Sequence, residues 1–260
     1  MNSITRILIP FDFGPVAQIA LKYALNFCTN NDRIDIMLCY VSDSDNHELK
    51  QEQMDTYLSN LSVRGHVTVS GKVTQGDFVA TLLKEQLDFK ADIMIMGTKG
   101  ANDVSGKAIS NTSIITLEAH CPVLVIPVDY EDFKIEQITL AIGNDKIDDP
   151  TVLNILLVIA RKYNAKIHVL AVYDEVDEDY YFERENEDVL KYYLDKYYSH
   201  NSTRRSSNIA DSIMEYNTSQ GVDMLAIIPR NHSTKSEPSE GKLTKYLTQK
   251  TDIPFLTMNI

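Results

Sequence analysis

The feature of this sequence that most restricts its fold is an internal repeat that spans nearly the whole chain. The run I-L-I-P-F-D at residues 7–12 returns as I-T-L-A-I-G-N-D at 138–145, so that Asp145 follows Asp12 by 133 positions. The run A-D-I-M-I-M at 91–96 returns as V-D-M-L-A-I at 222–227, and Pro122 returns 132 positions later as Pro254. Landmarks that recur in order at a nearly constant spacing indicate a duplicated domain.

Each copy alternates strand-like and helix-like segments. In the first copy the patterns predict strands near 6–12, 34–41, 66–73, 93–96 and 123–126, and helices near 15–29, 47–61, 76–87 and 110–121. Such alternation predicts right-handed crossovers and a parallel sheet covered by helices on both faces. We therefore predict an α/β protein with two tandem copies of a five-stranded, Rossmann-like parallel sheet. The boundaries are 1–128 for the first domain, 129–137 for a linker and 138–260 for the second domain.

Composition limits the partners of this chain. Its 260 residues include 25 Lys+Arg and 37 Asp+Glu, a formal net charge of −12. This balance argues against nucleic acid and against an anionic membrane, because both are bound through basic patches. No signal peptide or membrane span is visible, so we expect a cytoplasmic protein. The 3 cysteines form no C-x-x-C pair, which predicts reduced thiols and no metal or disulfide framework.

The stretch from Ala91 to Pro127 contains the candidate ligand loop. An apolar strand ends at Gly97 and Gly100, a polar loop follows, and a helix begins near Ser110. Glycine adopts positive φ readily and leaves backbone N–H groups accessible, and the start of a helix adds further N–H groups with a positive dipole end. A strand–loop–helix unit of this kind is where many α/β proteins hold phosphate.

Two further residues belong to the same predicted edge of the sheet. Asp12 follows the first strand, and the carboxyl ends of parallel strands meet at one edge, so we expect Asp12 beside the glycine loop. Ser110 or Asn111 is expected to cap the helix. Each feature also has a purely structural interpretation: the glycines as a tight connection, Asp12 as a helix cap or as an acceptor for backbone N–H groups, and Lys99 as a solvated side chain.

These residues resemble the universal stress protein family in its tandem form, across essentially the whole chain. The resemblance rests on I-L-I-P-F-D-F at 7–13, on A-D-I-M-I-M-G-T-K-G at 91–100 and on C-P-V-L-V-I-P at 121–127. It implies a five-stranded parallel sheet in each copy and, as in some members, binding of ATP with Mg²⁺. It also implies that the copies pair through their last strands, 123–126 and 255–258, as an internal pseudo-dimer. The residues that it places at the nucleotide are Asp12 and Val41 for the base and ribose, and Gly97, Gly100, Ser110 and Asn111 for the phosphates. Lys99 could meet a phosphate as a point charge, and Pro10 and Thr112 are further candidates for the same site.

Both copies depart from the family motif of G-x-x-G, nine residues, then glycine and Ser/Thr. In the first copy the third glycine is absent. Nine residues after Gly100, the glycine and Ser/Thr positions of the motif are occupied by Ser110 and Asn111 or, if one loop residue is deleted, by Ile109 and Ser110. In the second copy Ile228 and Asn231 replace the first two glycines, and Lys242 follows Gly241. We therefore expect no nucleotide site in the second copy.

Two functions from different classes follow. The first is a cytoplasmic stress-response protein that binds an adenine nucleotide in the first copy only. The second is a protein-interaction module that uses the acidic segment 174–188 and the tyrosines near it, Tyr180, Tyr181, Tyr192, Tyr193, Tyr197 and Tyr198. An ATP hydrolase or phosphotransferase is less favoured, because no catalytic base or set of metal-binding carboxylates is visible. Further homodimerisation and an unidentified protein partner are compatible with either function.

Overall fold

The computed structural model describes residues 3–42, 46–99, 110–143, 147, 149–173, 184–229 and 241–259. In the first half the strands are β1 (Arg6–Pro10), β2 (Arg33–Ser42), β3 (His66–Gln75), β4 (Ile93–Thr98) and β5 (Val123–Pro127). The helices are α1 (Pro15–Phe27), α2 (His47–Ser59), α3 (Phe78–Phe89) and α4 (Asn111–Glu118). Each lies where the sequence pattern predicts it.

The second half repeats this order. Its strands are β6 (Gln137–Ile142), β7 (Lys166–Tyr173), β8 (Tyr198–Arg205), β9 (Met224–Ile227) and β10 (Phe255–Thr257). Its helices are α5 (Asn154–Tyr163), α6 (Arg184–Leu194), α7 (Ile209–Gln220) and α8 (Lys242–Lys250), with short 3₁₀ turns η2 (Pro150–Leu153) and η3 (Asp195–Tyr197). The 3₁₀ turn η2 leads directly into α5, and β6 begins at the last residue of the predicted linker.

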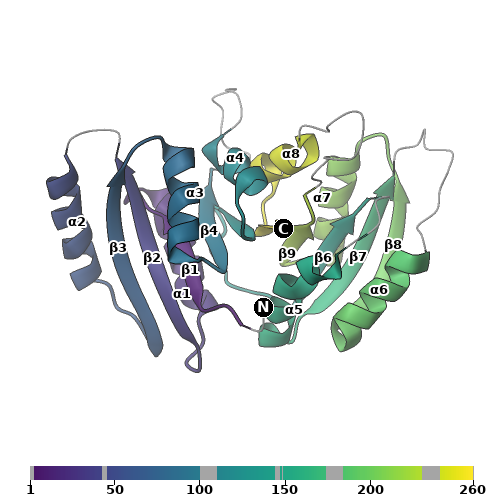
Figure 1. Cartoon of the computed structure of the whole chain (residues 1–260). Helices are drawn as coiled ribbons and strands as arrows, with labels where there is room; N and C mark the ends of the chain where they lie inside the picture. The colour runs from purple at the N-terminus through teal and green to yellow at the C-terminus, as the bar shows by residue number, and fades with distance from the viewer. Residues whose placement is uncertain are drawn as a thin grey trace.

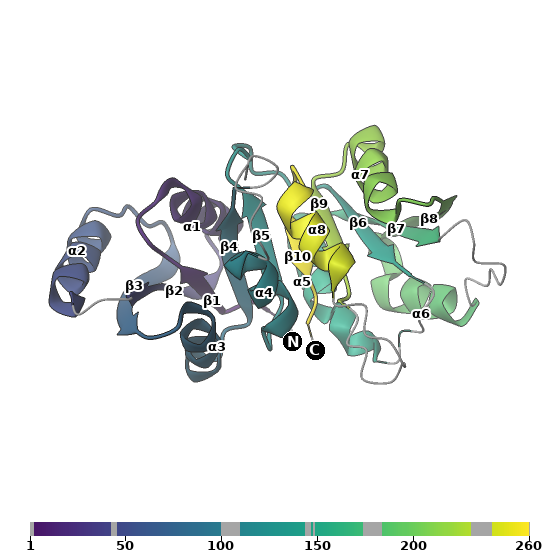
Figure 2. The same cartoon turned by 90° about the horizontal axis from the view of Figure 1, so that it is seen from above.

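The two halves join into one ten-stranded sheet with the order β3-β2-β1-β4-β5-β10-β9-β6-β7-β8. Strands within each half are parallel, and the halves meet where β5 and β10 pair antiparallel in the middle of the molecule (Figures 1 and 2). Leu124 lies opposite Leu256 at this seam, and these residues are equivalent in the repeat. The expected pairing of the copies through their last strands is confirmed.

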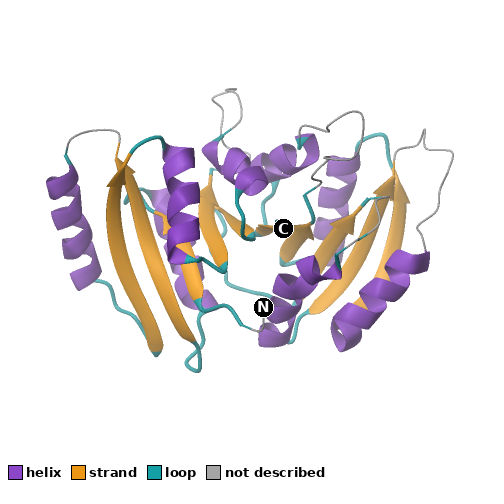
Figure 3. Ribbon diagram, in the orientation of Figure 1, coloured by secondary structure: helices purple, strands orange, loops and turns teal. Residues whose placement is uncertain are grey.

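Helices cover both faces of the sheet, as Figure 3 shows. One apolar core lies between the sheet and α1, α2, α5 and α6, and a second lies between the sheet and α3, α4, α7 and α8. Strands that are buried on both faces read as continuous apolar runs, which is why β1, β4 and β5 were visible in the sequence. The predicted α/β class is confirmed. None of the described helices combines the length and the apolar character that a membrane crossing requires.

An aspartate in each half fixes the start of the first strand. The carboxylate of Asp92 accepts hydrogen bonds from the backbone N–H groups of Thr5 and Arg6, at 2.7 and 2.9 Å. Asp223 does the same for Glu136 and Gln137, both at 2.8 Å. Arg6 and Gln137 are thus equivalent, and the repeat spacing in this strand is 131.

This spacing corrects the sequence alignment of the first strands. With Arg6 matched to Gln137, the residue equivalent to Asp12 is Gly143. Asp145, which the sequence spacing matched to Asp12, lies outside the described residues. The second copy has two more residues between the start of its first strand and the aspartate, which is why the sequence alone suggested a spacing of 133.

The halves also touch through residues on both faces of the seam. On one face Lys162 of α5 forms an ion pair with Asp32, and the Tyr163 hydroxyl donates to the carbonyl of Phe27. On the other face the hydroxyls of the equivalent residues Thr116 and Thr248 lie 3.5 Å apart and are fully buried. The seam is therefore a packed interface on both sides of the central strand pair.

Candidate functional site

The candidate site lies at the carboxyl ends of β1 and β4, which are neighbours in the sheet. From β1 the chain crosses to β2 on one side, and from β3 it returns to β4 on the other. The connections that follow β1 and β4 therefore run in opposite directions and leave a crevice between them, the usual ligand position in such sheets.

Gly97 allows the start of α1 to lie directly against β4. A Cβ atom at Gly97 would come within 2.0 Å of the Val16 carbonyl oxygen. The backbone of Gly97 is that of a strand, opposite Ile126 of β5, and its φ is not positive. The expectation that Gly97 serves through positive φ is therefore wrong, because close approach of a helix is what requires glycine here. This contact brings the β1–α1 turn to the end of β4.

Asp12 lies in that turn, with its side chain exposed. Its Oδ1 accepts a hydrogen bond of 2.9 Å from the backbone N–H of Gly14, the residue that precedes α1. The expected hydrogen bond from a backbone N–H group to Asp12 is therefore present. No described residue is bonded to Oδ2, so that this oxygen has capacity for a ligand hydroxyl.

The start of α4 supplies the other wall. Ser110 is its N-cap, and its Oγ accepts from the backbone N–H of Ser113 at 3.2 Å and lies 3.0 Å from the Ser113 hydroxyl. Capping by Ser110 is confirmed. Asn111 is exposed and Thr112 half-buried in the first turn, whose N–H groups have no partner within the helix. Lys99 is exposed after β4, and Gly100 lies outside the described residues.

Pro10 and Val41 lie on the opposite flank of the crevice. Pro10 ends β1 opposite Cys39 of β2, and the Phe11 N–H donates to the Cys39 carbonyl at 2.8 Å. Peptide groups in a strand alternate in direction, so Val41, two residues on, turns its backbone N–H and carbonyl to the same side. Because β1 has ended there, these groups face the crevice.

A cluster of aromatic rings near the site was not expected from the sequence. Phe11 and Phe13, on either side of Asp12, contact Tyr57 of α2 with ring centroids 4.9 and 5.8 Å away. Phe13 also lies 5.6 Å from Tyr40, the neighbour of Val41, and its φ of 64° is unusual for a bulky residue. The cluster ties the turn that carries Asp12 to β2. In the sequence, only the F-D-F run at residues 11–13 indicates this cluster.

Among its described residues, which exclude 144–146, 148 and 230–240, the second half does not repeat these features. Gly143 stands where the first half has Asp12, and Ile228 stands where it has Gly97. Gly241, which matches a motif glycine, has φ 61°, and a Cβ there would lie 2.6 Å from Leu117 of α4. Its structural role is therefore to pack against the other half.

The residues of the alternative function are dispersed. Tyr180 and Tyr181 lie outside the described residues. Tyr197 is buried in the core, and Tyr192 is 81% exposed, so the described tyrosines do not form one face. His168 is buried, and its Nε2 lies 2.8 Å from the Gln137 Oε1, as expected for a core histidine.

The chain was compared with known families and structures. Residues 3–127 match the family described as "Universal stress protein family". Over 98% of both chains, with 14% identity and a TM-score of 0.75, the structure is similar to a universal stress protein from Archaeoglobus fulgidus DSM 4304. A functionally unknown protein from Pseudomonas aeruginosa PAO1 aligns over 99% of this chain and 93% of its own, with 13% identity and a TM-score of 0.69.

A third similar structure is the cytoplasmic domain of a prokaryotic cation chloride cotransporter. It has 12% identity and a TM-score of 0.56, and the alignment covers 99% of this chain and 96% of that one. At these identities the likeness of structures concerns the fold alone. No curated protein sequence matches the chain.

Proposed function

Because residues 3–127 form a domain of the universal stress protein family and the second half repeats its fold, we propose that the first half binds an adenine nucleotide and the second does not. ATP with Mg²⁺ is the proposed ligand. Asp12, Val41 and Pro10 would hold the base and ribose. The phosphates would lie at the residues after β4 and at the start of α4, which are Gly97, Lys99, Gly100, Ser110, Asn111 and Thr112.

The observation that carries this proposal is the close contact of the start of α1 with Gly97 of β4. We infer that this contact holds the β1–α1 turn, and with it Asp12, near the end of β4, where the proposed phosphate loop begins. The Oδ2 of Asp12, to which no described residue is bonded, suits a ribose hydroxyl, and the backbone of Val41 offers one donor and one acceptor, which suits the edge of a base. The capped N-terminus of α4 favours an anion by its N–H groups and its dipole.

The proposed role is regulatory. A cytoplasmic protein of this kind would report nucleotide level through the surface at the carboxyl edge, and a protein partner would read that surface in the stress response. The proposal concerns binding, and release of inorganic phosphate from ATP is measured separately.

The test is thermal unfolding of the full chain with millimolar ATP and Mg²⁺. A ligand that binds the native state increases the free energy of unfolding, by about 2.7 kcal/mol when its concentration is 100 times Kd. The melting temperature therefore rises. We expect ATP to stabilise the native protein and the Asp12→Ala variant to lose the effect.

Asp77→Ala is the matched control. Asp77 is also exposed, follows a strand at the same edge and accepts from a backbone N–H, that of Ala80 at 3.0 Å. The stabilisation by ATP should persist in this variant. Absence of any ATP effect in the native chain would overturn the proposal and leave the interaction module as the better hypothesis.

A further inference from the structure

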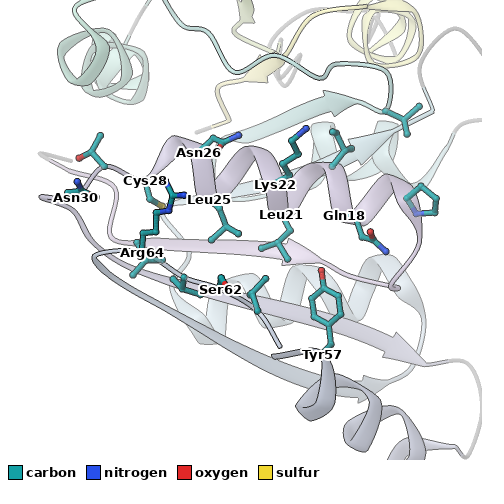
Figure 4. Close-up of a pocket in the computed structure, with 17 residues that line it drawn as sticks. Gln18, Leu21, Lys22, Leu25, Asn26, Cys28, Asn30, Tyr57, Ser62 and Arg64 are labelled. Carbon is teal, nitrogen blue, oxygen red and sulfur yellow. The ribbon is translucent and has the colours of Figure 1, made fainter. Parts of the chain in front are cut away.

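A groove of about 970 Å³ runs along α1 in the first half (Figure 4). One wall is α1 with the residues after it, and the other is the end of α2 with the segment that leads into β3. Its volume is within the usual range of small-molecule sites. The lining residues are Pro15, Gln18, Ile19, Leu21, Lys22, Leu25, Asn26, Cys28, Thr29, Asn30, Tyr57, Leu61, Ser62, Val63, Arg64, Val67 and Val128.

The lining of the groove is mixed: polar and apolar surface contribute about equally, and apolar side chains form a strip along its floor. Leu21 and Leu25 lie one helical turn apart on α1 and point toward Tyr57 and the segment after α2 (Figure 4). Leu61 and Val67 continue this surface on the other wall. Gln18 and Ser62, by contrast, are exposed, so the groove is open to solvent along its length.

The charges that line the groove are all positive. They are Lys22 and Arg64, both exposed, and no lining residue is acidic, although the chain has a net charge of −12. No described residue forms an ion pair with either side chain. Asp32, an acid near the end of α1, is already bound by Lys162 and Thr29.

Arg64 is the cation best placed to meet a ligand in the groove. In Figure 4 it extends from the second wall toward Cys28 and the end of α1. Arg64 also has a structural interpretation that requires no ligand, because the helix dipole favours a guanidinium near a helix C-terminus. If Arg64 binds a ligand, its replacement lowers the affinity for an added anion; if its role is structural, the affinity does not change.

The second half fills the equivalent space. There η3 lies before β8, packs against α5 and buries Tyr197 in the core. In the first half no helical turn precedes β3, and Val63 remains 37% exposed. The groove is therefore a feature of the first half.

We propose that this groove binds a single-chain amphipathic anion, of the class of long-chain carboxylates. The chain lies on the half-buried side chains of Leu25 and Leu61, above the buried Leu21, and the carboxylate lies at Arg64. This site is independent of the proposed nucleotide site, since Asp12 does not line the groove.

Cys28 provides an internal reporter for the test. It lines the groove and is half-buried, whereas Cys39 and Cys121 are buried, and all 3 are free thiols. Burial raises the pKa of Cys28 to about 11 and those of Cys39 and Cys121 to about 12. Alkylation of the folded protein at mildly alkaline pH should therefore modify Cys28 first, and mass spectrometry of peptides would follow it.

The experiment adds monomeric dodecanoate to the full chain and measures both calorimetric binding and the rate of Cys28 alkylation. We expect saturable binding and slower alkylation. Dodecyltrimethylammonium, which has the same tail and the opposite charge, should bind more weakly. Equal binding of both amphiphiles, or binding to anionic phospholipid vesicles without binding of monomeric dodecanoate, would overturn the proposal.

Three variants separate the site from general effects. Arg64→Gln should weaken dodecanoate binding about threefold to fivefold, the value expected for one exposed ion pair, and Arg161→Gln, an exposed arginine on α5, should not. Ser62→Trp adds bulk at an exposed position, should block binding, and introduces the only tryptophan, so a blue-shifted emission verifies that the indole enters the groove. Asp12→Ala should leave dodecanoate binding unchanged. An affinity that is the same in Arg64→Gln and the native chain would contradict the assignment of the carboxylate to Arg64.

Discussion

Every strand of the first half has an equivalent in the second half, yet the halves differ at the end of their first strands. In the first half, Asp12 bonds to Gly14, and α1 starts against Gly97. In the second, Gly143 and Ile228 occupy these places, and the 3₁₀ turn η2 precedes α5. By contrast, Asp92 and Asp223 make the same bonds to the first strand in both halves. Within the part of the chain that the structure describes, the residues that build the fold are repeated, and those at the candidate site are found in the first half.

The largest effect should follow from Gly97→Val. A Cβ would lie 2.0 Å from the Val16 carbonyl oxygen, so α1 must move or the side chain must strain the backbone. We expect a loss of about 3 kcal/mol or more in the free energy of unfolding, as for severe overpacking. Urea unfolding measures it.

The equivalent change in the second half is Ile228→Val. Since it only removes one methylene from a partly buried side chain, it should cost about 0.5 to 1.5 kcal/mol. Equal losses for the two variants would refute the idea that only the first half requires a glycine at this position.

Replacement of the repeated aspartates should have a smaller and similar effect in both halves. Asp92→Ala leaves the N–H groups of Thr5 and Arg6 without their acceptor, and Asp223→Ala does so for Glu136 and Gln137. We expect each variant to lose about 2 kcal/mol in unfolding free energy, since hydrogen bonds to a charged group contribute about 1.5 to 3 kcal/mol. A large loss in one half alone would show that the aspartate does not stabilise the first strand in the same way in both halves.

The cap of α4 should contribute about 1 kcal/mol. Ser110→Ala removes the acceptor of the Ser113 N–H, whereas α8 in the second half has Gly241 at its N-cap and no side-chain cap to lose. Ser110→Asn, which retains a capping oxygen, is the control for the unfolding measurement. If the alanine and asparagine variants unfold alike, the hydrogen bond from Ser113 does not stabilise the helix.

The smallest effect concerns the ion pair between the halves. Burial raises the pKa of Asp32, but hydrogen bonds from Lys162 and Thr29 outweigh it and hold the pKa below its ordinary value. The stabilisation is therefore present above the unfolded pKa of about 3.9 and is lost as the pH falls through the lower folded pKa.

Asp32→Asn should accordingly lose about 0.5 to 1 kcal/mol at neutral pH, the upper part of the range for surface ion pairs, because both side chains are partly buried. Urea unfolding at several pH values would show the difference from the native chain disappear in acid. A difference that grows as the pH falls would have the wrong sign.

Much of the fold was readable from the sequence because it depends on local patterns. Apolar runs predicted β1, β4 and β5, and the family resemblance implied the pairing of the last strands, in which Leu124 lies opposite Leu256. Strand β8 was not predicted, because the run Y-S-H-N-S-T-R-R lies at the edge of the sheet and lacks an apolar face. Edge strands of this kind are specified by their neighbours and not by their own pattern.

The site was predicted less completely because its geometry depends on contacts between distant segments. The requirement for Gly97 comes from Val16 of a different element, and the equivalence of Asp12 with Gly143 comes from hydrogen bonds of Asp92 and Asp223. The rings of Phe13 and Tyr57 meet only after α2 folds onto the sheet. Sequence spacing carries none of this information.

The most direct test of the difference between the halves is the number of ATP sites per chain. Isothermal titration of the native protein with ATP and Mg²⁺ should give one site for each chain of 260 residues, and Asp12→Ala should abolish it. Two sites per chain, or no site at millimolar ATP, would contradict the proposal that only the first half binds a nucleotide.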